Sequence, residues 1–154
     1  MHEKNFESQF VSVDIDGKKT ILGTIYHTPK QNHKPFLENL KNVLKECNKI
    51  NKRVFIMGDL NYDLLKTENN DVNNCNDTFF EHGMYPLINV PTRITESTAS
   101  ILDQIWTNVV DIPAKSAVVA NPVSDHLPVY LNFGIKKSQD DLFIEKRIFS
   151  EKKY

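Results

Sequence analysis

The sequence contains little of what marks secreted, disulfide-stabilised or membrane-spanning proteins. Its two cysteines, Cys47 and Cys75, form neither a C-x-x-C pair nor a zinc-ligand spacing, which is typical of reduced thiols in an intracellular protein. No stretch approaches the roughly 18 consecutive apolar residues that a membrane-spanning helix needs, and the first residues lack the apolar core of a signal peptide. We therefore expect a protein that is not secreted, acts in the nucleus or cytoplasm, and has no membrane partner.

An excess of charge of one sign is also missing. The 154 residues carry 19 Lys and Arg against 20 Asp and Glu, which gives a net charge of −1. This balance argues against a histone-like or generic polyanion binder, which would be strongly basic. It leaves open an enzyme that handles phosphates through a metal ion, because the metal supplies its own positive charge. With 40% hydrophobic residues, the length and composition predict one globular domain.

Hydrophobic periodicity predicts an order of strands and helices. We expect strands at 10–15 and 20–26 joined by a hairpin at Asp16-Gly17, then a helix over 34–50 and a buried strand at 53–57. The remaining expectations are a loop over 66–74, a short helix at 77–82, and strands at 87–90, 100–107, 114–120 and 128–133. This pattern predicts an α/β fold with mixed strand directions. We expect the domain to span residues 1–135, followed by a charged tail or linker over 136–154.

The first chemically informative segment follows the buried strand at 53–57. Gly58 lets the backbone turn, and Asp59 and Asn61 follow at an i, i+2 spacing that points both side chains to one side of an extended chain. A carboxylate and an amide at the end of a strand suit a hard cation and a phosphate oxygen. The alternative is an ordinary turn, since these residue types are common in turns.

Two further segments combine acidic residues and a histidine. Ser124-Asp125-His126 precedes an apolar strand and suits a metal ligand beside a general base, although an exposed loop with a capping Asp gives the same pattern. Asp103 interrupts an apolar strand, which is costly unless its charge is paired, and a histidine would supply the partner. A Ser-His-Asp hydrolase is excluded because three consecutive residues cannot form the triad geometry.

Together these segments resemble the endonuclease/exonuclease/phosphatase superfamily. More narrowly, the chain is similar to the endonuclease domain of non-LTR (LINE-type) retrotransposons. The additional segments that carry this resemblance are Ile25-Tyr26-His27-Thr28-Pro29, Pro91-Thr92-Arg93-Ile94-Thr95 and Asp103-Gln104-Ile105-Trp106-Thr107-Asn108. The resemblance covers residues 8 to 135 and implies an α/β-sandwich in which mixed sheets are flanked by helices.

The resemblance also implies a reaction, the hydrolysis of a DNA phosphodiester that depends on Mg²⁺ or Mn²⁺. It implies that Asp125 is a metal-site carboxylate, that Asp103 fixes the ring of His126, and that the general base is either Asp59 or His126. The other roles that it implies belong to groups that contact water or phosphate: Asp59 and Asn61 at the attacking water and scissile phosphate, Tyr26 on the phosphate, and Thr92 and Arg93 at the rim of the site.

The sequence departs from the family at two places. The family's N-terminal part, with a metal-binding Glu, has no counterpart upstream of Tyr26, and His27 stands where relatives usually have Arg. We therefore expect a domain that lacks its N-terminal part, from a retrotransposon-derived reading frame whose full-length form also encodes a reverse transcriptase. The alternatives are a catalytically inactive remnant and a phosphatase on the same scaffold. We expect His33, which stands alone in a polar context, to lie at the surface.

Overall fold

The computed structural model describes residues 7–29, 32–50, 52–110, 114–120 and 124–133. The strands β1 to β3 and the two helices are β1 (Glu7–Ile15), β2 (Lys18–Tyr26), α1 (His33–Ile50), β3 (Arg53–Asp59) and α2 (Asn70–Phe80). The later strands are β4 (Tyr85–Pro86), β5 (Arg93–Ile94), β6 (Ala99–Ser100), β7 (Asp103–Thr107), β8 (Ala114–Val118) and β9 (Val129–Phe133). The expected tail, 136–154, lies outside the described residues.

The main sheet has the strand order β1-β2-β3-β7-β4. β1 and β2 form the expected antiparallel hairpin, and β2 pairs with β3 in parallel through the crossover helix α1. β7 then runs antiparallel to both β3 and β4. This mixed sheet with its helices confirms the predicted α/β fold.

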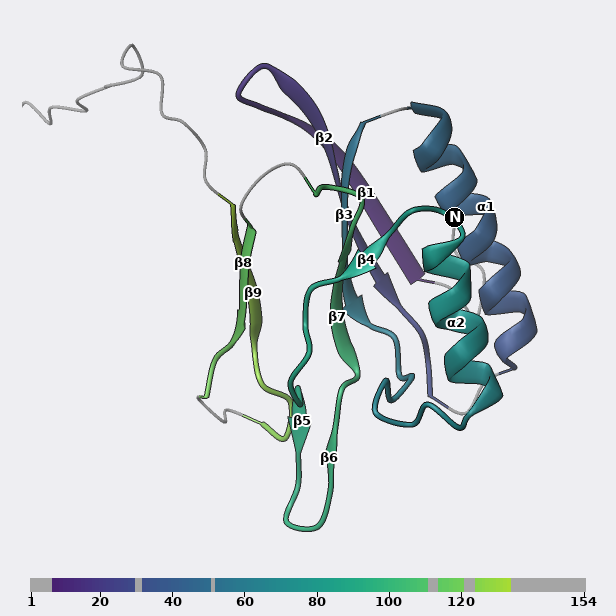
Figure 1. Cartoon of the computed structure of the whole chain (residues 1–154), viewed down its shortest axis with the longest axis vertical. Helices are drawn as coiled ribbons and strands as arrows, with labels where there is room; N and C mark the ends of the chain where they lie inside the picture. Colours follow the sequence, from purple (N-terminus) through teal and green to yellow (C-terminus); the bar gives the residue numbers. More distant parts are fainter. Residues whose placement is uncertain (1–6, 30–31, 51, 111–113, 121–123, 134–154) are drawn as a thin grey trace, which may run out of the picture.

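The main sheet is the middle of three layers (Figure 1). On one face, α1 and α2 bury an apolar core whose largest fully buried side chains are Phe36, Phe79 and Trp106. On the other face the β8–β9 hairpin lies against β7, where Val118, Val129 and Leu131 pack on a smaller core of Ile88, Ile101 and Ile105. The short β5–β6 hairpin projects beyond the end of the sheet at which β3 ends and β7 begins. Segments from distant parts of the sequence therefore meet at that end.

The second helix begins earlier than the sequence predicts. The predicted loop at 66–74 and helix at 77–82 are replaced by a helix that begins at Asn70. Asn69 causes the difference, because its side chain accepts hydrogen bonds from the backbone N–H groups of Asp71 and Val72. Such a cap satisfies donors that a helix start otherwise leaves unpaired, and it lets a polar, Asn-rich segment become the first turns of α2.

The predicted strand at 87–90 is also wrong, since the strand beside β7 is Tyr85–Pro86 instead. The Gln104 side chain uses both hydrogen-bonding groups of the Ile88 backbone. Its Oε1 accepts from the Ile88 N–H and its Nε2 donates to the Ile88 carbonyl, both at 2.8 Å. A side chain thus replaces the strand ladder at this point.

The predicted strand at 100–107 divides into β6 and β7. The division falls at Ile101 and Leu102, whose carbonyl groups accept hydrogen bonds from Leu64 and Leu60 instead of from a neighbouring strand. In the described part of the chain, no helix is both long enough and apolar enough to cross a membrane.

Candidate active site

The site begins at the carboxyl end of β3, where the chain turns sharply. A Cβ on Gly58, which has φ +152°, would collide with the Ile25 carbonyl oxygen of β2, so only glycine lets the two strands approach so closely here. Asn61 has a left-handed backbone with φ 51°. Two hydrogen bonds hold that conformation: the Asn61 N–H donates to Asp59 Oδ1 at 2.9 Å, and its side-chain Nδ2 donates to the His27 carbonyl at 2.8 Å.

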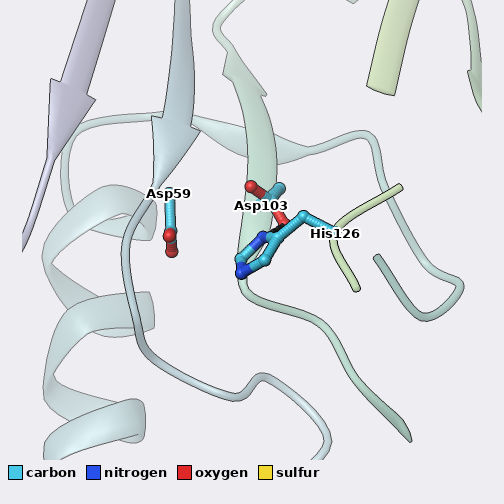
Figure 2. A group of neighbouring side chains, drawn as sticks. All are labelled: Asp59, Asp103 and His126. Carbon is cyan, nitrogen blue, oxygen red and sulfur yellow. Dashed lines mark hydrogen bonds and ion pairs between the residues drawn. The ribbon is translucent and has the colours of Figure 1, made fainter. Parts of the chain in front are cut away.

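Asp59, Asp103 and His126 come together from three different segments (Figure 2). Asp59 ends β3 and lies opposite Asp103, the first residue of β7, in the antiparallel ladder. His126 Nδ1 donates to Asp103 Oδ2 at 2.9 Å. One ligand atom from each of the three residues lies within 4.8 Å of the others. The carboxylate that interrupts an apolar strand therefore has the histidine partner that its buried surroundings require.

The group of Asp59, Asp103 and His126 places two carboxyl groups close together. Burial raises the pKa of the Asp59 carboxyl, and the neighbouring Asp103 carboxylate adds to the rise, while the hydrogen bond from the Asn61 N–H opposes it. Asp59 thus resists ionisation beside a second carboxylate. A cation placed against the two groups would relieve this repulsion.

Asp125 lies next to His126 but forms a different pair. The Arg93 Nε donates to Asp125 Oδ2 at 2.7 Å, in an exposed ion pair. The hydrogen bond from Arg93 is the main reason why the pKa of Asp125 is lowered. Asp125 is outside the group of three, so its role as a metal ligand stays a prediction. Arg93 is linked to the site by its ion pair with Asp125, the neighbour of His126.

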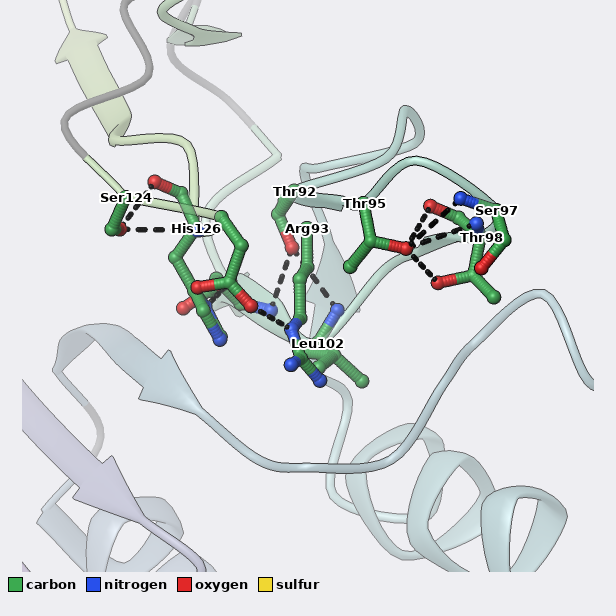
Figure 3. A network of polar contacts seen from close by, with 10 residues as sticks. Thr92, Arg93, Thr95, Ser97, Thr98, Leu102, Ser124 and His126 are labelled. Carbon is green, nitrogen blue, oxygen red and sulfur yellow. Dashed lines mark hydrogen bonds and ion pairs between the residues drawn. The ribbon is translucent and has the colours of Figure 1, made fainter.

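Thr92 does not lie at the rim, where the sequence interpretation placed it. Its side chain is fully buried, with 0% exposed, and its Oγ1 accepts from the backbone N–H groups of Leu102 at 3.1 Å and Asp103 at 3.0 Å (Figure 3). Its carbonyl also accepts from the Leu127 N–H at 2.6 Å. Thr92 therefore connects the start of β7 to the segment that carries His126, which makes it an internal support of the site.

At the carboxyl end of β2, consecutive side chains lie on opposite faces of the main sheet. Tyr26 is 38% exposed and remains available for a phosphate contact, whereas His27 is 1% exposed and lies in the helix-side core. The side chain of His27 packs on the Phe36 ring, with centroids 4.2 Å apart, and stacks on Tyr62 at 5.0 Å. His27, which stands where relatives usually have Arg, thus lies in the core and not beside Tyr26.

A cluster of polar aromatic residues behind the site was not predicted. His33 is half-buried rather than a free surface residue: its Nδ1 lies 2.9 Å from the Tyr62 hydroxyl and its Nε2 lies 3.5 Å from Asp71 Oδ2. Alternation along β2 places His27 on the face opposite to Tyr26, a signal that was present in the sequence. The partners of His33 could not be predicted, because they come from α2 and from the loop after β3.

The donor set of the group fits a divalent cation. Two adjacent carboxylates offer the oxygen ligands that Mg²⁺ and Mn²⁺ prefer. The His126 Nδ1 is used by Asp103, so Nε2 is the ring nitrogen left for a ligand, a water or a phosphate. The arrangement can therefore hold a cation between carboxylates and present a positioned imidazole beside it.

Known proteins share this arrangement of elements. The endonuclease domain of TRAS1, a telomere-specific non-LTR retrotransposon, aligns with a TM-score of 0.71 and 22% identity over 86% of this chain and 65% of its own. An endonuclease/exonuclease/phosphatase family protein from Leptotrichia buccalis aligns with a TM-score of 0.63 and 14% identity. The alignment covers 83% of this chain and 53% of that protein. The structure of D. rerio TDP2 complexed with a single-strand DNA product aligns with a TM-score of 0.57 and 16% identity. The alignment covers 84% of this chain and 69% of TDP2.

These likenesses show the fold, an α/β-sandwich of the endonuclease/exonuclease/phosphatase type. The chain spans about two thirds of the length of the TRAS1 domain, 65%. No curated protein matches the sequence. Residues 20–130 match the sequence pattern described as endonuclease-reverse transcriptase, and every residue of the group in Figure 2 lies within that range. The chain therefore belongs to the endonuclease-reverse transcriptase family of the endonuclease/exonuclease/phosphatase superfamily.

Proposed function

We propose that this chain is a metal-dependent phosphodiester hydrolase domain that acts on DNA. The observation that carries the proposal is the convergence of Asp59, Asp103 and His126 within 4.8 Å, with the ring of His126 fixed by Asp103. Family membership supports it, as do the TRAS1 endonuclease domain and the TDP2–DNA complex among the similar structures. The family's description supports a reverse transcriptase domain as the partner encoded with this one.

The cation of the proposal is Mg²⁺ or Mn²⁺. Asp59 and Asp103 would hold it, and Asp125, whose carboxylate is exposed and kept ionised by Arg93, is the candidate for a further ligand. When bound, the cation stabilises the negative charge that develops on the phosphate during in-line attack.

His126 is the general base in this proposal. Because Nδ1–H donates to Asp103, the lone pair is on Nε2, and that nitrogen can accept a proton from the attacking water. The Asp103 carboxylate then stabilises the imidazolium that forms. Asp59 is the alternative base, because its carboxylate lies in the same group of three within 4.8 Å.

Three groups would contact the substrate phosphate. Asn61 uses one amide N–H on His27, so its second amide N–H remains for a phosphate oxygen. Tyr26, which is 38% exposed at the end of β2, offers its hydroxyl. Arg93 would share its guanidinium between Asp125 and a phosphate, a geometry for which arginine is well suited. Thr92 supports these groups from below without touching the substrate.

Nicking of supercoiled plasmid in Mg²⁺ tests the proposal. We expect the parent to nick, EDTA to stop the reaction, and His126→Ala, Asp59→Ala and Asp125→Ala to abolish it. His82→Ala is the matched control, because His82 follows α2 and lies toward the Thr107 end of β7, away from Asp103. Restoration of His126→Ala by added imidazole would identify His126 as the base, and failure to restore it would favour Asp59. A folded parent that does not nick, or nicking that survives His126→Ala, would contradict the proposal.

A further inference from the structure

His27 holds three consecutive residues, Asp59 to Asn61, at the end of β3 and the start of the loop that follows. Its backbone N–H donates to the Asp59 carbonyl at 3.0 Å, and its carbonyl accepts from Asn61 Nδ2 at 2.8 Å. Its ring Nδ1 lies 3.0 Å from the Leu60 carbonyl oxygen. One residue thus contacts the whole segment that begins with the Asp59 carboxylate.

The ring contact fixes the chemistry of the imidazole. A carbonyl oxygen only accepts, so Nδ1 must carry the proton and donate it to Leu60. In the neutral imidazole Nε2 is then an unprotonated acceptor, and this buried atom has no hydrogen-bond partner among the described residues. A buried acceptor without a partner is unfavourable. An apolar side chain in place of His27, packed between Phe36 and Tyr62, would avoid this cost. The Nδ1–H donor is therefore the property that distinguishes a histidine from an apolar residue at this position.

The loop needs such a support. Asn61 has φ 51°, a left-handed conformation that is uncommon outside glycine but that asparagine adopts more readily than most residues, and neighbouring contacts stabilise it here. Two of the contacts that could maintain it come from His27, through its carbonyl and through the Leu60 bond immediately before Asn61. Without the ring bond to Leu60, one of these two contacts is lost, and the loop can relax and move the Asp59 side chain, whose Oδ1 accepts from the Asn61 N–H.

We propose that His27 is a positioning residue, which holds the 59–61 loop so that the Asp59 carboxylate faces Asp103 and His126. It acts through the Nδ1–H bond to Leu60, from the core behind the site, and not by touching the substrate. The effect on catalysis rests on the proposed function, whereas the effect on the loop rests on the geometry alone.

Three substitutions separate the donor from the bulk of the ring. His27→Asn keeps an amide N–H at a position close to that of Nδ1. His27→Gln moves the amide one bond further out, toward the position of Nε2, and His27→Leu removes the donor. His82→Leu is the matched control, because His82 Nδ1 also donates to a backbone carbonyl, that of Thr78, at 2.8 Å.

Two measurements on each folded variant test the proposal: the hydrogen exchange rate of the Asn61 N–H by NMR, and kcat and KM of plasmid nicking. We expect about tenfold faster exchange in His27→Gln and His27→Leu, as for the loss of a buried hydrogen bond. We also expect kcat to fall about tenfold to a hundredfold, as for a misplaced catalytic group, with KM within about twofold of the parent. His27→Asn should stay within about threefold of the parent in both measurements, and His82→Leu should leave the Asn61 N–H unchanged.

The outcomes distinguish this inference from the proposed function. Parent-like exchange in His27→Leu, or a His27→Asn variant no better than His27→Gln, would overturn the positioning role. So would faster exchange with unchanged kcat. If His27→Leu does not fold, the comparison of the Asn and Gln variants decides. A parent that does not nick would overturn the proposed function, and the exchange rates would still decide whether His27 holds the loop.

Discussion

Replacing Thr92 by Val tests whether one buried hydroxyl supports the active site. The substitution keeps the volume and the branched shape of the side chain, so that no cavity forms. It removes the Oγ1 atom that accepts from the N–H groups of Leu102 and Asp103. Both donors would then lack a partner at the point where β7 begins.

The size of the effect follows from the burial of these two donors. An unpaired buried N–H costs about 1–3 kcal/mol, and the bond to Asp103 is only partly buried, so the second loss falls at the lower end. We expect Thr92→Val to lower the free energy of unfolding by roughly 2–4 kcal/mol, a large share of the total stability of a domain. For a chain of this length, each kcal/mol corresponds to about 2–4 °C in Tm, and we therefore expect a fall of roughly 5–15 °C.

Thr92→Ser provides the control. It keeps the hydroxyl and removes one methyl group, which costs about 1 kcal/mol. Urea unfolding of the parent and both variants gives the three free energies on one scale. A Thr92→Val protein as stable as Thr92→Ser would refute the reasoning, because the hydroxyl would then contribute nothing beyond its volume.

Three further predictions concern the charge and the backbone of the site. A raised folded-state pKa favours the protonated Asp59, so Asp59 contributes stability at acidic pH that is lost as the pH rises through the folded value. Asp59→Asn should therefore melt above the parent at pH 7 in EDTA, with the difference vanishing at acidic pH. Gly58→Ala should cost at least about 2 kcal/mol in urea unfolding, against about 1 kcal/mol for Gly17→Ala, where φ is also positive but the space is open. Arg93→Gln should raise the pKa of Asp125 in an NMR titration, because Arg93 is the main cause of its lowering.

Local patterns in the sequence were sufficient for most of the main sheet. Alternation and the Asp16-Gly17 turn predicted the β1–β2 hairpin, and helical spacing of apolar residues predicted α1 to within a residue. The predictions went wrong where a side chain bonds to the backbone: Asn69 at the start of α2 and Gln104 against Ile88. Such contacts depend on how the backbone of another segment is placed, which a periodicity does not contain.

The site was predictable as a set of residues and not as a set of contacts. The order of Asp59, Asp103 and His126 along the chain pointed to a family, and the structure brings the three together. The position of Thr92 could not be predicted, because its hydroxyl partners are backbone N–H groups where β7 begins, in another segment of the chain. For His27, alternation along the strand predicts the face of the sheet on which its side chain lies. It does not predict the side chains that cover that face, so the burial of His27 could not be predicted in full.

A titration with Mn²⁺, followed by NMR, tests the central claim most directly, namely that Asp59, Asp103 and His126 act as one metal-binding site. The paramagnetic ion broadens the signals of nearby nuclei. We expect the signals of these three residues to broaden first, and Mg²⁺ in excess to restore them. We also expect the broadening to be lost in an Asp59→Asn/Asp103→Asn double variant that remains folded. Broadening that begins elsewhere in the chain, or that persists in the double variant, would contradict the account.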